Sequence, residues 1–321
     1  MDSDQTFHAK TLFYQGSYAA CHAAIGQIEE PSFQLILFSA RSLIALKKPK
    51  EAIEILKPYH ADHPAAKAVT LLAKYHSKPN HNQTEKESIG EEAEGLADEI
   101  LDEDHDGIDS ILRVTIATVL HLIDNTNLAI FLLKQGVQLK SLESVSLLIY
   151  LYLTSKVKRP DLARMLYKSV KGWADDAILL QMTEAWIGTV TGSGANTNGK
   201  ESGGYQSAFY VFDEISSSTG SDSVSVNVAG LNGKAVTQLA MGHVEEAQAN
   251  LSEALKANPK DETTLANSIV ASGHADSAVS TAGEHLEQLR SINPSHPLVV
   301  DLDRQLALFD EAASKFVASK A

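Results

Sequence analysis

Small residues recur in this sequence at the spacing that two packed helices require. The clearest unit runs from Leu231 to Pro259, and within it Ala235 and Ala247 lie 12 residues apart. Helices that touch at about 8 to 10 Å leave no room for a larger side chain where they cross. Gly242 would end the first helix of this unit, and Pro259 would end the second. The unit therefore predicts two helices folded back on one another.

The same spacing is found in both halves of the chain. Alanines 12 residues apart also occur as Ala40 and Ala52, Ala117 and Ala129, and Ala266 and Ala278. The 34 residues from Ala129 to Ala163 equal the tetratricopeptide period. Helix pairs are expected near residues 4–28, 32–57, 108–136, 141–171, 175–217, 228–257 and 261–290, with a degenerate eighth pair at 65–101.

These repeats predict an all-α fold, a tetratricopeptide-like α-α superhelix (solenoid), open or curled. A single helical-repeat domain is expected over residues 1–321, with repeats over about 4–300 and a C-terminal capping helix at 301–320. Residues 65–109 hold the acidic degenerate repeat, and 191–204 are expected to form a flexible insert because Gly, Ser and Asn dominate there. Ser223–Val228 alternates as a strand would, but the repeat spacing overrides that interpretation.

The composition excludes several classes of protein. There are 27 basic and 41 acidic side chains, a net charge of −14, and no long basic stretch, so nucleic acid and anionic lipid are not expected partners. The single cysteine, Cys21, excludes an intramolecular disulfide and a Cys-based zinc site. Leu147–Leu153 is far shorter than a membrane span, so no direct membrane insertion is expected. The N-terminus has no secretory signal pattern, so we expect a cytoplasmic protein.

Two short motifs resemble ligand sites but lack an essential residue. Gly194–Lys200 resembles a phosphate-binding loop, yet Glu201 follows where Ser or Thr should hold Mg²⁺. Asp102–Gly107 resembles the start of a calcium loop, yet Arg113 occupies the position of the bidentate Glu. No HExxH or GxSxG motif occurs. We therefore expect no catalytic residues, no cofactor and no metal, and enzyme activity is the weak hypothesis.

The segment Glu85–Asp109 contains twelve acidic residues and one lysine. Most charge runs of this kind are solvated faces, but a surface for a basic partner is the alternative.

The first helix of each pair lines the concave side of such a solenoid, where partner segments bind. Extrapolated from the small residues, the inward positions are Leu37, Ile44, Val114, Leu148, Tyr152, Met182, Trp186, Val236 and Leu239. They are apolar, which indicates a near-permanent protein interface with Tyr152 and Trp186 as anchors. The alternative is that they are inter-repeat core and that the assumed register is one residue off.

Several blocks of sequence, taken in order, resemble one family. They are Phe13–Tyr18, Asp175–Trp186, Tyr205–Phe212, Leu231–Val236, Glu262–Asn267 and Ser295–Pro297. Each block is short, but the ordered series spans nearly the whole chain and is similar to the epsilon subunit family of coatomer.

The resemblance implies a non-enzymatic subunit of the COPI coat, with a curled tetratricopeptide solenoid that encloses the C-terminal domain of the alpha coat subunit. It implies a hetero-oligomer with the alpha and beta-prime subunits and the rest of coatomer, peripheral on Golgi and COPI vesicle membranes. The implied role is Golgi-to-ER retrograde and intra-Golgi transport. The alternative is a co-chaperone-like adaptor, which would need a Lys, Arg or Asn clamp for acidic peptide tails. A third interpretation, a nucleotide-dependent enzyme, would depend on Lys200.

Overall fold

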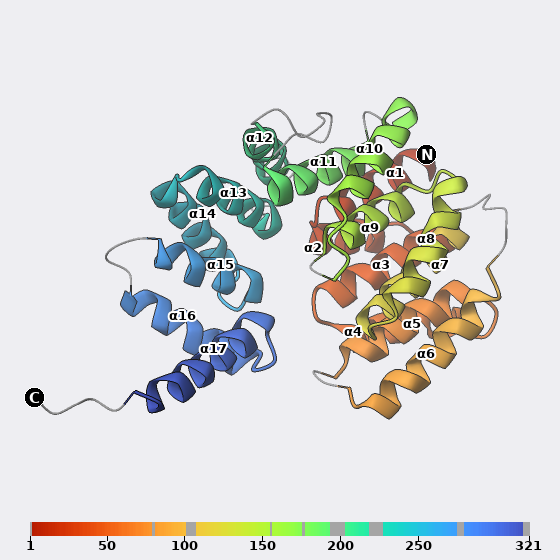
Figure 1. Cartoon of the computed structure of the whole chain (residues 1–321). Helices are drawn as coiled ribbons and strands as arrows, with labels where there is room; N and C mark the ends of the chain where they lie inside the picture. The colour runs from red at the N-terminus through yellow and green to blue at the C-terminus, as the bar shows by residue number, and fades with distance from the viewer. Residues whose placement is uncertain are drawn as a thin grey trace, which may run out of the picture. The chain divides into compact units, whose positions relative to one another are not determined.

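The computed structural model describes residues 2–78, 81–100, 107–154, 156–174, 177–192, 203–217, 227–274 and 279–316. Within these ranges the chain forms seventeen α-helices and no strand, which confirms the all-α prediction (Figure 1). The phosphate-loop and calcium-loop resemblances lie outside the described residues except for Gly107, as does most of the insert expected at 191–204.

Consecutive helices form pairs. The first five pairs are α1 (Asp2–Tyr14) with α2 (Tyr18–Gly26), α3 (Phe33–Ala45) with α4 (Pro49–Leu56), α5 (Pro64–His76) with α6 (Gln83–Ala97), α7 (Ile108–Leu122) with α8 (Thr126–Gln138), and α9 (Leu142–Leu153) with α10 (Pro160–Ala174). The remaining helices are α11 (Ile178–Thr191), α12 (Gly204–Ser217), α13 (Val228–Met241), α14 (Val244–Ala257), α15 (Glu262–Gly273), α16 (Val279–Ile292) and α17 (Pro297–Ser314).

Small residues lie where paired helices cross. The six alanines Ala40, Ala52, Ala117, Ala129, Ala235 and Ala247 are all fully buried. In the last of the alanine pairs used to define the repeat, Ala266 is only half-buried, and Ala278 lies outside the described residues. Glycine takes the same role between α11 and α12, since a Cβ on Gly188 would lie 2.5 Å from the carbonyl oxygen of Gly204. Side-chain size at these crossings therefore sets how closely the helices approach.

Polar side chains fix where several helices begin. The backbone N–H of Glu85 donates to Asn82 Oδ1 at 2.8 Å, and the backbone N–H of Asn82 donates to Glu85 Oε2 at 3.2 Å. This reciprocal capping box satisfies two N–H groups that have no partner within α6. Asp261 caps α15 with its side chain alone, which accepts a hydrogen bond from the backbone N–H of Thr264 at 2.8 Å.

The described helices belong to two compact units. Unit 1 comprises Met1–Val211 with Ser218–Ser225, and unit 2 comprises Phe212–Ser217 with Val226–Ala321. Unit 1 has one contiguous hydrophobic core that extends from Ala9 to Ile187. In unit 2, Leu265, Leu289 and Val299 form the core beneath α17.

Unit 1 curls back on itself. Arg41 on α3 forms an ion pair with Glu143 on α9, with Nη2 and Oε2 2.6 Å apart. The Tyr14 hydroxyl on α1 donates to Oε1 of the same carboxylate at 2.8 Å. Helix α1 also packs against α11. The first two helix pairs of unit 1 therefore contact its fifth and sixth, as Figure 1 shows for α1, α3 and α9.

Candidate partner-binding surface

Five of the nine residues expected to line a partner groove are in the core of unit 1. They are Leu37, Ile44, Val114, Leu148 and Tyr152, and none is more than 8% exposed. The physical reason is that successive first helices pack on one another, α3 on α5, α5 on α7 and α7 on α9. These five side chains are therefore core residues in this conformation, which is the alternative that the sequence left open.

The contact that closes unit 1 is itself buried. The side chains of Arg41 and Glu143 are 12% and 10% exposed. The Arg41 guanidinium lies 4.6 Å from the ring centre of Phe13 and 5.3 Å from that of Phe38, within cation–π range. Burial raises the pKa of Tyr14, and the neighbouring Glu143 carboxylate raises it further, so the phenol stays protonated and remains a donor.

Three rings on successive first helices form an aromatic row, made of His121 on α7, Tyr150 on α9 and Trp186 on α11. The ring centres of His121 and Tyr150 are 6.4 Å apart and those of Tyr150 and Trp186 are 6.3 Å apart, both in edge-to-face geometry. Tyr150 is 48% exposed, while His121 and Trp186 are half-buried. The aromatic row is therefore a surface feature that rests on the core.

Tyr150, and not Tyr152, is the accessible tyrosine of α9. Residues two positions apart on an α-helix point about 200° apart, so the two side chains face nearly opposite directions. The buried stripe of α9 follows helical spacing through Val145, Leu148, Ile149 and Tyr152. A helical projection centred on that stripe would have placed Tyr150 outside the core, and this was the signal missed in the sequence.

The remaining four expected groove residues are half-buried. Met182 and Trp186 lie one turn apart on α11, and the next position on the same stripe is Val190, which is exposed. Val236 and Leu239 are on α13 in unit 2, where Leu239 packs against a small core that includes Ala247. Trp186 therefore belongs to the aromatic row, and Met182 lies one turn before it on the same helix.

The aromatic row is uncharged at neutral pH. Burial lowers the pKa of His121, and the positive charge of Lys156 lowers it further, so the imidazole is neutral at pH 7. Its Nδ1 lies 3.0 Å from the Thr126 hydroxyl. Asp124 pairs with both Lys86 and Lys156, so one positive charge is left in excess beside His121. The three rings of the row themselves offer a mainly apolar surface, which suits an apolar partner.

Other chemistry has little support in the described part of the chain. No group of three His, Cys, Asp or Glu side chains there is arranged to hold a metal ion. Cys21 is buried, and burial raises the pKa of its thiol. Among the described helices, none combines the length and apolar character needed to cross a bilayer.

The chain is similar to several coatomer subunits over nearly its whole length. It is 28% identical to coatomer subunit epsilon of Dictyostelium discoideum, over 98% of this chain and 100% of that protein. It is 29% identical to coatomer subunit epsilon-1 of Arabidopsis thaliana, over 92% of this chain and 91% of that protein. A probable coatomer subunit epsilon of Schizosaccharomyces pombe is 28% identical over 83% of this chain and 79% of that protein.

Solved structures of low sequence identity share the fold. One chain of the solved APC/C hetero-tetramer Cut9-Hcn1 superposes with a TM-score of 0.58 at 15% identity, over 94% of this chain and 55% of that one. A tetratricopeptide repeat protein from Parabacteroides merdae superposes with a TM-score of 0.54 at 11% identity, over 84% of this chain and 96% of that one. The family model of the coatomer epsilon subunit matches residues 2–317. The chain therefore belongs to the coatomer epsilon subunit family, and it is a non-enzymatic subunit of the COPI vesicle coat.

Proposed function

We propose that this chain binds and stabilises the C-terminal domain of the alpha coat subunit, and that the aromatic row is the main anchor. The observation that carries the proposal is the family match over residues 2–317. Within the coat, the chain would associate with the alpha and beta-prime subunits on Golgi membranes and serve Golgi-to-ER retrograde and intra-Golgi transport.

The aromatic row has the properties of an interface hot spot. Trp and Tyr supply large contact areas with few rotatable bonds, and they are enriched among the residues that dominate binding energy. Tyr150 and Trp186 hold each other edge to face, so little side-chain entropy remains to be lost on binding. Met182 and Val190 extend the same face along α11 with apolar surface. An apolar partner would therefore gain most by covering these side chains.

Co-expression with the C-terminal domain of the alpha coat subunit tests this function directly. Size-exclusion chromatography with light scattering should show a single 1:1 complex. Trp186→Ala and Tyr150→Ala should each weaken the complex by about 2 kcal/mol or more, as hot-spot truncations do. The matched control is Trp173→Ala, because Trp173 is an exposed tryptophan on α10, a second helix, and its loss should leave the affinity unchanged.

Each result has a distinct meaning. Separate elution of the two proteins, each folded by circular dichroism, would reject the alpha-subunit partner. A complex that tolerates both aromatic truncations would reject the aromatic row while keeping the partner. Binding of acidic peptide tails in place of the alpha-subunit domain would favour the co-chaperone-like adaptor.

A further inference from the structure

Helix α6 and the two residues that follow it, Asp98 and Glu99, carry two rows of carboxylates with different surroundings. The row that faces α5 consists of Glu85, Glu92 and Glu99, each seven residues from the next. Each has a lysine partner on or just after α5, with N–O distances of 2.5 Å for Lys78–Glu85, 3.8 Å for Lys74–Glu92 and 3.8 Å for Lys67–Glu99. This row is therefore electrically compensated by the chain itself.

The second row, here called the acidic row, consists of Glu87, Glu91, Glu94 and Asp98. All four residues are exposed, and none forms an ion pair within the described part of the chain. Glu87 accepts a hydrogen bond from Gln83 Nε2 at 3.0 Å, and Glu94 accepts one from Asn125 Nδ2 at 3.4 Å. These two contacts supply no positive charge to the acidic row.

The acidic row does not help α6 to fold. Its members are three or four positions apart, where like charges destabilise a helix by about 0.2 to 0.5 kcal/mol per pair. Asp98 lies at the C-terminal end of α6, where the helix dipole disfavours negative charge. A row of carboxylates that opposes the stability of its own helix is better explained by a ligand than by folding.

The acidic row borders two adjoining hollows that share Glu94. The shallower one, of about 270 Å³, lies between Glu87, Glu91 and the Ile123 side of α7. The deeper one, of about 480 Å³, is lined by Glu94, Asp98 and the apolar side chains of Ile100, Leu128, Phe131 and Leu132. We call the two together the acidic hollow. Its edge therefore combines carboxylates with apolar surface.

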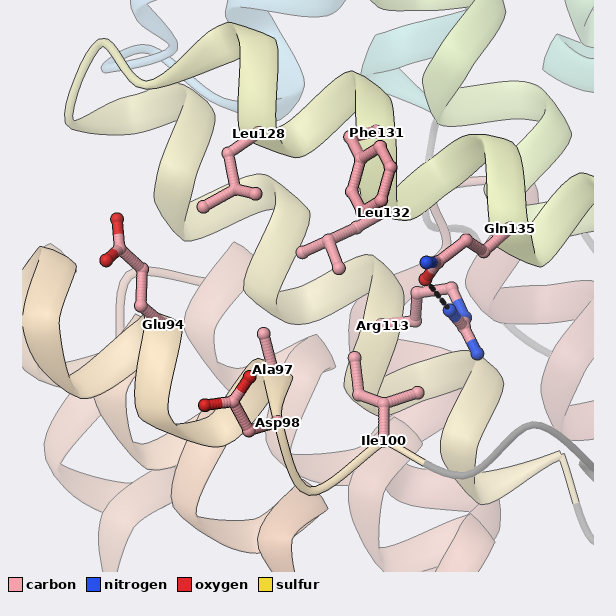
Figure 2. Close-up of a pocket in the computed structure, with 9 residues that line it drawn as sticks. All are labelled: Glu94, Ala97, Asp98, Ile100, Arg113, Leu128, Phe131, Leu132 and Gln135. Carbon is pink, nitrogen blue, oxygen red and sulfur yellow. Dashed lines mark hydrogen bonds between the residues drawn. The ribbon is translucent and has the colours of Figure 1, made fainter.

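Figure 2 shows that the carboxylates and the apolar side chains of the deeper hollow lie on different sides of it. Glu94 and Asp98 project from α6 at one side, and Leu128 and Phe131 project from α8 across from them. Phe131 is 58% exposed although it is large and apolar. Arg113 lies at the other end, buried, and donates to Gln135 Oε1 at 2.8 Å. Arg113 thus lies away from the acidic row, and Lys86, the cation that lines the shallower hollow, is paired with Asp124.

We propose that the acidic hollow binds a short basic segment of a protein partner, with Lys or Arg side chains on the acidic row and one apolar side chain between Ile100, Leu128 and Phe131. Charge complementarity selects cations, and the apolar wall selects segments in which a hydrophobic residue alternates with them. The Phe131 ring also offers its face to a neighbouring cation. Glu87 and Asp98 are 11 positions apart, about 16 Å along the helix, which an extended segment of about five residues would span.

This site is separate from the aromatic row. It is built from α6, α7 and α8, whereas the row follows α7, α9 and α11, and the two can be altered independently. The inference therefore does not depend on the alpha-subunit partner.

The probe for this site is a fluorescein-labelled, amidated peptide of about eight residues in which Lys and Leu alternate. Fluorescence anisotropy with the full chain should show saturable binding that weakens with added salt, because exposed charge pairs are screened. The control peptide alternates Lys with Ser, so it keeps the charge and loses the apolar side chains. It should bind at least several-fold more weakly.

Paired substitutions on the same helix give the decisive comparison. Glu91→Gln with Asp98→Asn removes two charges from the acidic row, and Glu92→Gln with Glu99→Gln removes two charges from the row that faces α5. The first double variant should lose about three- to tenfold in affinity for the Lys–Leu peptide, and the second less than about twofold. Phe131→Ser should lose more affinity for the Lys–Leu peptide than for the Lys–Ser peptide, because both peptides can place a cation on the ring but only the first has apolar side chains.

Three results would overturn the proposal. They are an absence of binding, equal losses in the two double variants, and equal affinity for the two peptides. Equal losses of affinity in the two double variants would show that the peptide responds only to the net charge of the protein. All substituted residues are exposed, so unchanged thermal unfolding checks that the variants are folded.

Discussion

At the scale of the residue, one carboxylate joins three helices of unit 1. Glu143 accepts hydrogen bonds from Arg41 and Tyr14, although these residues are more than 100 positions away in the sequence. A buried ion pair of this kind contributes little net stability when it is intact, but breaking it leaves a buried charge without a partner. Helical periodicity gives no sign of this contact, because it depends on how far the repeats turn.

Glu143→Gln should therefore destabilise unit 1 by about 3 to 5 kcal/mol, since Arg41 stays buried while its counter-charge is lost. Urea unfolding followed by circular dichroism measures this change. Glu51→Gln is the matched control, because its pair with Lys48 is exposed and should be worth less than about 1 kcal/mol. Equal effects of the two substitutions would contradict a buried, closing ion pair.

At the scale of the element, the sequence predicted the helix pairs well where small residues mark the crossings. It predicted the accessible face of the first helices less well, since an error of two residues on α9 exchanges Tyr150 for Tyr152. Packing between pairs, rather than within a pair, decides which face is covered. That information lies in contacts between distant segments, which a local pattern does not contain.

Ala247→Leu on α14 tests the crossing rule. Ala247 is fully buried at the contact with α13, so the added carbons should overpack it and cost about 1 to 3 kcal/mol of unfolding free energy. Ala249→Leu, two residues further along the same helix, is exposed and should change stability by less than about 0.5 kcal/mol. Thermal or urea unfolding of the two variants gives the comparison, and an unchanged Ala247→Leu protein would refute the crossing role.

The turn between α7 and α8 carries a pH-dependent contact. Hydrogen bonds from Lys156 and Lys86 lower the pKa of Asp124 below its usual value of 3.8. A carboxyl whose pKa is lower in the folded state contributes stability above its unfolded pKa and loses that stability as the pH falls through the folded pKa.

Asp124→Asn should therefore be slightly less stable than the original protein at neutral pH. It should also lose slightly less stability than the original protein when the pH falls below about 4. Asn also tolerates the left-handed backbone at this position, where φ is 74°, so the substitution tests the charge rather than the turn. Urea midpoints of the two proteins should differ at pH 7 and converge toward pH 2. A constant difference over that range would contradict the ion pairs as its cause.

At the scale of the whole molecule, the family and the all-α repeat fold were both predictable from the sequence. The spacing left open whether the solenoid curls, and a curled solenoid was expected only as what the family resemblance implies. In a solenoid each repeat contacts its neighbours, so the sequence spacing predicts contacts between adjacent repeats only. It does not predict contacts between the first and the last repeats. The contact of α1 and α3 with α9 depends on the small rotation between successive pairs, summed over unit 1.

Because unit 1 is closed by this contact, it differs from open repeat arrays in how it folds and in whether it can gain or lose a repeat. An open array folds by nearest-neighbour steps and tolerates the gain or loss of a repeat at many places. In unit 1, inserting or deleting one pair between α3 and α9 would move Glu143 away from Arg41 and Tyr14 and leave a charge buried alone. The number of pairs between α3 and α9 is therefore constrained by the contacts of one carboxylate, and these contacts form only when α1, α3 and α9 are all in place.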